Sequence, residues 1–205
     1  MGSLSMTQKA LKLVATLSID RCSTLLSKMI KKGATIELEN VSHEDISGVT
    51  ATIMGTEDRE VVAAFVDLEG DAPFKFLFYV NVKDSLVLAD MILRKEPGTT
   101  KEFDEYASSA VQELGNILAS GCTNVFVKDF KIAMKPTPPV VVKDYLSTMF
   151  QEYIMNVACQ QDKLLMIETV FVVMGQNIPC AMFILPIPGS EQVLVDKILK
   201  DMPEF

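Results

Sequence analysis

The stretch Ser108-Ser-Ala-Val-Gln-Glu-Leu-Gly-Asn-Ile-Leu-Ala-Ser-Gly121 decides the fold, because it predicts a helix with two different faces. Each helical residue advances by about 100°, so Ser109, Glu113 and Asn116 fall within about 60° of one another. The apolar residues centre about 130° away from this motif stripe, which defines a buried face. The motif stripe presents a hydroxyl, a carboxylate and an amide in a row. A solvated helix face without function gives the same pattern, so the stripe alone does not define a site.

Helical and strand-like segments alternate along the whole chain. The motif helix is expected over residues 99–120, with Thr100 as its N-cap. A hairpin turn is expected at Gly175-Gln176-Asn177. The other expected helices cover residues 7–31 (with a possible interruption at 18–21), 84–94, 142–158 and 191–200. The expected strands cover residues 34–39, 48–54, 61–68, 74–82, 130–134, 164–174 and 178–186.

The order of these segments repeats after about half of the chain. At an offset of 100 residues, Cys22, Lys28 and Lys31 fall on Cys122, Lys128 and Lys131, and later matches follow at offsets of 105 and 106. The repeat predicts an α+β fold of two pseudo-twofold halves, residues 6–97 and 98–205, in one domain. We expect a continuous, mostly antiparallel sheet with two long helices packed on one face. Residues 1–5 are expected to be a cloning leader.

Composition and charge exclude several classes of partner. The 205 residues carry 19 basic and 27 acidic side chains, for a formal net charge of −8. This balance argues against nucleic acid, whose binding depends on a cationic surface, and against an anionic membrane surface. No apolar run approaches the roughly 20 residues that span a bilayer. We expect a cytoplasmic protein.

Several familiar chemistries are also unsupported. The single histidine, His43, is expected in a surface loop. The four cysteines are far apart and form no CxxC pair, so a zinc site has no support and reduced, buried thiols are expected. No glycine-rich phosphate loop occurs. We expect no metal or cofactor of the protein's own.

The motif stripe is part of a longer pattern. Ser109, Glu113 and Asn116 have the spacing S-x-x-x-E-x-x-N, and after 21 further residues comes Pro138. This pattern resembles the signature of the CheC/CheX/FliY family of chemotaxis phosphatases. The resemblance extends to the duplicated order of segments over residues 8–200.

The resemblance implies an activity in two-component signalling. It implies hydrolysis of the aspartyl phosphate on a CheY-type response regulator, which supplies its own Mg²⁺. Glu113 would enter the regulator's active site and pair with its lysine, and Asn116 would orient the attacking water. Ser109 would help to shape the helix surface, and Pro138 would have an architectural role.

The first half departs from the family pattern. A CheC-type chain carries the motif twice, but here Lys9, Leu13 and Thr16 occupy the positions of the motif stripe. One site per chain is therefore predicted, as in the CheX type, whose members dimerise, although the length is nearer to CheC. The subfamily, a homodimer and a CheD partner stay open. The alternative function is a non-catalytic CheC-like adapter that binds a receiver domain or a flagellar switch component.

Overall fold

The computed structural model describes residues 5–30, 34–45, 58–149, 163–173 and 176–201. Its helices are α1 (Met6–Met29), α3 (Val82–Ile92), α4 (Glu105–Asn124) and α6 (Ser190–Asp201), and α4 continues into a π-helix, η1 (Val125–Asp129). Its strands are β1 (Ala34–Asp45), β2 (Glu60–Gly70), β3 (Phe74–Asn81), β4 (Met134–Pro136), β5 (Val140–Tyr145), β6 (Lys163–Val173) and β7 (Gln176–Pro186).

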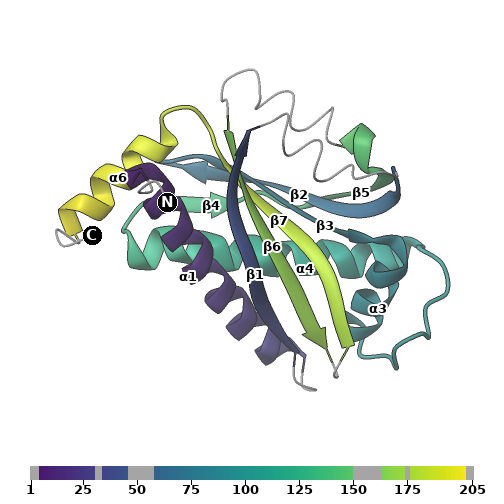
Figure 1. The fold of residues 1–205 in the computed structure, drawn as a ribbon. Coiled ribbons are helices and arrows are strands. Elements are labelled where there is room, and N and C mark those ends of the chain that lie inside the picture. Colours follow the sequence, from purple (N-terminus) through teal and green to yellow (C-terminus); the bar gives the residue numbers. More distant parts are fainter. Residues whose placement is uncertain (1–4, 31–33, 46–57, 150–162, 174–175, 202–205) are drawn as a thin grey trace.

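Within the described residues, seven strands form one antiparallel sheet in the order β1-β6-β7-β3-β2-β4, with β5 also paired to β2. The central pair, β3 and β7, comes from the two different halves. The first strand of each half crosses over to the other half, because β1 pairs with β6 and β4 and β5 pair with β2. This arrangement confirms the predicted α+β fold with a continuous antiparallel sheet and pseudo-twofold halves (Figure 1).

Element boundaries match between the halves at the offset of 100 residues. Helix α1 ends at Met29 and η1 ends at Asp129. Strand β1 covers Ala34–Asp45, whereas β4 begins at Met134 and β5 ends at Tyr145. The duplication is therefore visible in the backbone as well as in the few matching side chains.

Alternation along the strands divides the core into two layers. Residues such as Phe76 and Phe78 face α1 and α4, whereas the intervening Leu77 and Tyr79 face the opposite side. Burial of one such phenylalanine contributes about 1.5–3 kcal/mol relative to an exposed position. Helices α1 and α4 lie next to each other on one face of the sheet, as predicted (Figure 1).

The two long helices touch at positions related by the duplication. Gly121 of α4 lies so close to α1 that a methyl group there would be 2.4 Å from Cys22 Sγ. Cys22 also donates to the Leu118 carbonyl, 3.2 Å away. The pKa of the Cys22 thiol lies well above its usual range, mainly because of its hydrogen bond with the Cys122 thiol and secondly because of its burial. The expected burial of the thiols is confirmed for Cys22, Cys122 and Cys180, and Cys159 lies outside the described residues.

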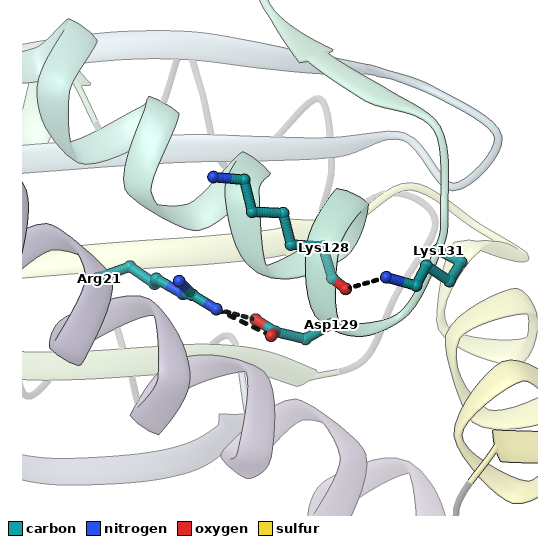
Figure 2. A network of polar contacts seen from close by, with 4 residues as sticks. All are labelled: Arg21, Lys128, Asp129 and Lys131. Carbon is teal, nitrogen blue, oxygen red and sulfur yellow. Dashed lines mark hydrogen bonds and ion pairs between the residues drawn. The ribbon is translucent and has the colours of Figure 1, made fainter.

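An ion pair joins α1 to the end of the motif helix. Figure 2 shows Arg21 reaching both carboxylate oxygens of Asp129, at 2.9 and 3.2 Å, while Lys131 donates to the Lys128 carbonyl. Arg21 lies where an interruption of α1 was expected, but the helix is continuous from Met6 to Met29. It continues because Ser18 and Ile19 are buried on its core-facing side. Ser5 caps α1 by accepting from the Gln8 N–H.

The start of the motif helix differs from the prediction. Asp104, and not Thr100, is the N-cap of α4, and its side chain accepts from the Ala107 N–H at 2.8 Å. Thr100 instead donates through its backbone N–H and its hydroxyl to the buried carboxylate of Asp90 in α3. The threonine therefore fastens the connection between α3 and α4.

Apolar composition misled the prediction in two further segments. Residues 130–133 are not a strand, because η1 continues α4 and Phe130 and Ile132 are buried without pairing to a strand. Residues 142–145 are not helical, because β5 pairs with β2 as far as Tyr145. Residues 146–149 are helical, and 150–158 lie outside the described residues.

Three smaller predictions concern strands and turns. His43 lies within β1, opposite Leu165 of β6, and not in a loop, because β1 continues past residue 39. The antiparallel pairing of β6 with β7 agrees with the predicted hairpin, but Gln176 and Asn177 belong to β7, opposite Val173 and Val172, and Gly175 lies outside the described residues. The expected strand 48–54 lies outside the described residues. None of the described helices is long and apolar enough to cross a membrane.

Candidate active site

Helix α4 exposes the motif stripe and buries the opposite face. Ser109, Glu113 and Asn116 are all exposed. The buried residues include Ala110, Val111, Leu114, Leu118 and Ala119. The amphipathic pattern predicted from the sequence is thus present, and the buried face fixes the direction in which the stripe points.

Close packing sets the height of α4 above the sheet. A methyl group on Gly115 would lie 2.8 Å from the Ala64 Cβ of β2 and 3.4 Å from the Pro139 Cβ. Because a glycine is needed for this approach, α4 sits directly against both the strand and the residues that connect β4 to β5. The motif stripe is therefore carried on a helix with little freedom to shift.

The proline segment, residues 136–139, lies beside the motif stripe. It interrupts the edge of the sheet between β4 and β5. Thr137 holds it in place twice, since its N–H donates to the Asp67 carbonyl at 2.8 Å and its hydroxyl accepts from the Asp67 N–H at 3.0 Å. Pro139 is buried, whereas Pro138 is exposed. Pro139 therefore supplies the packing contact with α4, and the architectural role of Pro138 stays a prediction.

An open groove of about 380 Å³ lies between the motif stripe and the proline segment. The structure brings all four predicted site residues to its lining, which consists of Ser109, Gln112, Glu113, Asn116, Pro136, Thr137, Pro138 and Pro139. The sequence prediction missed Gln112 and Thr137. In the sequence, Gln112 is marked only by its position next to Glu113, because the helical pattern does not show which residue its side chain contacts.

Gln112 bridges the two sides of this groove. Its side-chain N–H donates to the Pro139 carbonyl at 2.9 Å. The bond joins α4 directly to the proline segment, independently of the Thr137 bonds to β2. The groove therefore has two walls that are fastened to each other.

The groove offers hydrogen-bonding groups without a nucleophile–base pair. A carboxylate, an amide and a hydroxyl can dock a polar partner or orient a water molecule. His43 lies in β1, at the opposite edge of the sheet from β4 and β5. Across the residues that the structure describes, no group of three or more His, Cys, Asp or Glu side chains could hold a metal ion. The chemistry of such a site would depend on what a partner brings.

Helix α1 presents a different surface at the equivalent positions. Lys9 and Thr16 are exposed, but Leu13 is partly buried and packs against the core. The Thr16 hydroxyl is bound within the helix, where it donates to the Lys12 carbonyl at 3.0 Å. At these three positions α1 therefore presents neither the carboxylate nor the amide.

The structure thus combines a doubled antiparallel sheet with an S-x-x-x-E-x-x-N helix that lies beside a proline segment. Residues 107–142, which carry both parts of the site, match the model of the CheC-like family. The resemblance to the CheC/CheX/FliY family is thereby confirmed for the segment that carries the motif.

Solved structures extend the likeness to the whole fold. Thermotoga maritima FliY is 15% identical over 98% of this chain and 100% of that chain, with a TM-score of 0.78. A chain of the Borrelia burgdorferi CheX–CheY–BeF₃–Mg²⁺ complex is 17% identical over 83% of this chain and 96% of that chain, with a TM-score of 0.54. A chain of the H. pylori FliM–SpeE complex is 11% identical over 98% of this chain and 99% of that chain, with a TM-score of 0.69. These TM-scores establish a shared fold.

Proposed function

We propose that this protein is a phosphatase that hydrolyses the aspartyl phosphate of a CheY-type receiver domain. The observation that carries the proposal is the placement of Glu113 and Asn116, exposed on one face of α4 and lining a groove with Pro138. Side chains at i and i+3 have Cβ atoms about 5–6 Å apart, so both can enter one pocket of a partner. Their helix is held by close packing at Gly115.

The residues suit a reaction whose substrate is already activated. Glu113 pairs with the lysine of the receiver and fixes the docking. The Asn116 amide holds a water molecule in line with the phosphorus. The oxygen of this water attacks the phosphorus as the bond from phosphorus to the aspartyl oxygen breaks. The aspartate leaves as a carboxylate, and the oxygen and both protons of the water end in inorganic phosphate. The receiver supplies the Mg²⁺ that offsets the charge of the phosphoryl group.

A similar fold supports this choice of partner. The Borrelia burgdorferi complex combines CheX with a CheY protein, BeF₃ and Mg²⁺. Beryllofluoride stands in for a phosphoryl group, so the complex resembles a phosphorylated receiver with its metal. The proposal for this chain follows that precedent and places the single site on α4.

A non-catalytic adapter is the alternative function. FliY and the FliM complex share the fold over nearly the whole chain, with higher TM-scores than the CheX complex. The replaced stripe on α1 also shows that a helix of this fold need not carry the motif. An adapter would bind a receiver domain or a flagellar switch component and leave its phosphate in place.

The rate of phosphate loss from a phosphorylated receiver distinguishes these functions. We expect the wild-type protein to accelerate the loss beyond the receiver's own decay, and Asn116→Ala to remove most of the acceleration. Binding of the beryllofluoride-activated receiver without acceleration would favour the adapter. Equal rates for the wild type and Asn116→Ala would contradict the assigned mechanism.

A further inference from the structure

The edge of the sheet is irregular at the same place in both halves. In β1, Leu38 pairs with Thr169 and Asn40 pairs with Glu168, so one extra residue stands between them. In the second half, Pro136 pairs with Leu68 and Val140 pairs with Phe65. The edge therefore advances by four residues, from 136 to 140, where β2 advances by three, from 68 to 65. Both edges therefore carry one extra residue at the same point, as in a β-bulge.

The irregularity has different consequences in the two halves. Strand β1 continues through it without a break, from Ala34 to Asp45. In the second half it separates β4 from β5, because Pro136, Pro138 and Pro139 have no N–H to donate to a ladder. Bulges occur often at sheet edges and next to active sites, where they re-aim a side chain or terminate strand pairing. Here the widened bulge forms one wall of the groove beside the motif stripe.

Opening the edge turns the Pro139 carbonyl toward α4, where Gln112 binds it at 2.9 Å. Gln112 directly precedes Glu113 in the sequence and lies one helical turn before Asn116. Pro139 itself is buried against Gly115. Any movement of the proline segment away from α4 must therefore break the Gln112 bond and widen the groove.

We propose that Gln112 is a positioning residue, which fastens the proline segment to α4 and so keeps the groove at the width that admits the phosphorylated loop of a receiver domain. This inference rests on the proposed function, because it assigns a docking role to the same site. Gln112 acts through the Pro139 carbonyl and touches neither the phosphorus nor the attacking water. At the offset of 100 residues the first half has Lys12, beside a strand that is not opened.

The test uses a variant that keeps the size of the side chain and removes its donor. Gln112→Met has a similar length and a good helix propensity, but it cannot donate to a carbonyl. Gln192→Met is the matched control, because Gln192 is also exposed on a helix, donates to Asp196 at 2.6 Å and lies outside the groove lining. The full-length variants are assayed with a phosphorylated receiver over a range of receiver concentrations.

We expect Gln112→Met to raise KM for the receiver about three- to ten-fold and to leave kcat within about two-fold, in keeping with the loss of one hydrogen bond. Its affinity for the beryllofluoride-activated receiver should fall by the same factor. Gln192→Met should match the wild type in both measurements. A selective loss of kcat in Gln112→Met would place Gln112 in the chemical step and overturn the positioning role.

Hydrogen exchange separates this inference from the proposed function. Without any receiver, the Thr137 N–H should exchange faster in Gln112→Met than in wild type. The proline segment then loses its hydrogen bond to α4 and keeps only its hydrogen bonds to β2. Unchanged exchange together with unchanged KM would overturn the positioning role, whatever the activity. If the wild-type protein fails to accelerate phosphate loss, the proposed function fails, and the exchange rates still decide whether Gln112 holds the segment.

Discussion

Helices α1 and α4 occupy equivalent places in the two halves, yet only α4 carries the motif stripe. Both helices pack on the same face of the sheet and share buried contacts, including Cys22 on one and Cys122 on the other. Their outward surfaces differ completely. The comparison teaches that the two helices keep burial at equivalent positions, such as Cys22 and Cys122, while their motif positions carry different side chains.

The two halves also differ at the edge of the sheet that lies beside each helix. The edge near α4 is opened by the proline segment, whereas β1 remains a single strand. Under the proposed function, the site consists of two parts, a polar helix face and an opened edge. The predictions below alter one part at a time.

The largest effect is expected from Glu113→Ala. Loss of the docking carboxylate should lower kcat/KM for the phosphorylated receiver about 100-fold or more, as misplacement of a reacting pair does. The control is Glu105→Ala, since Glu105 is also an exposed carboxylate of α4 but lies outside the groove lining. Phosphate release from the labelled receiver measures both. Equal losses in the two variants would mean that the general negative charge of α4, and not Glu113, supports docking.

A stability effect tests the contact between the helices. Gly121→Ala should reduce the free energy of unfolding by about 1–3 kcal/mol, because the added methyl group overpacks the contact with Cys22. Ser120→Ala, one residue earlier, adds no atom and should have little effect. Denaturant unfolding measures the difference between the two variants. Stability equal to wild type for Gly121→Ala would contradict the close approach of α1 and α4.

Transfer of the motif to α1 tests whether the helix face is sufficient. We expect the double change Leu13→Glu/Thr16→Asn to restore no phosphatase activity in an Asn116→Ala background, because β1 is one unbroken strand and the edge beside α1 is not opened. Replacement of the partly buried Leu13 by a carboxylate should also cost about 1–3 kcal/mol of stability. The rate of phosphate release is compared before and after the transfer. Restored activity would show that the opened edge is dispensable.

The smallest effect concerns the face of the sheet opposite α1 and α4. Hydrogen bonds from the Ser147 side chain and backbone lower the pKa of Asp58 below its ordinary value of 3.8. Since the folded pKa lies below the unfolded one, this contribution is present above pH 3.8 and is lost as the pH falls through the folded value. Asp58→Asn should be slightly less stable than wild type at pH 7, and the gap should shrink as the pH falls below 3.8. A gap that grows on acidification in unfolding experiments would contradict this.

The sequence predicted the features that depend on periodicity and spacing. The α4 stripe, the strands β2, β3, β6 and β7 and the duplication follow from local patterns, which burial in the sheet does not disturb. The site residues of the motif lie together because Asn116 and Pro138 are held in register by the packing of Pro139 on Gly115.

Other features depend on contacts that a local pattern does not contain. Asp104 replaces Thr100 as the cap because Thr100 is taken by Asp90, a partner ten residues earlier. Residues 142–145 form a strand because β2 offers an unpaired edge, which overrides a helical reading of the same residues. The Gln112 bond depends in the same way on where the proline segment comes to lie.

The most direct test compares equivalent single changes on the two helices in one assay. Asn116→Ala and Thr16→Ala each shorten one exposed side chain at matching positions of the duplication. Phosphate release from a phosphorylated CheY-type receiver is followed at a saturating protein concentration, after both variants are shown to unfold at the same denaturant midpoint. We predict that Asn116→Ala loses most of the acceleration and that Thr16→Ala keeps the wild-type rate. Equal rates for the two variants would contradict the assignment of the chemistry to α4.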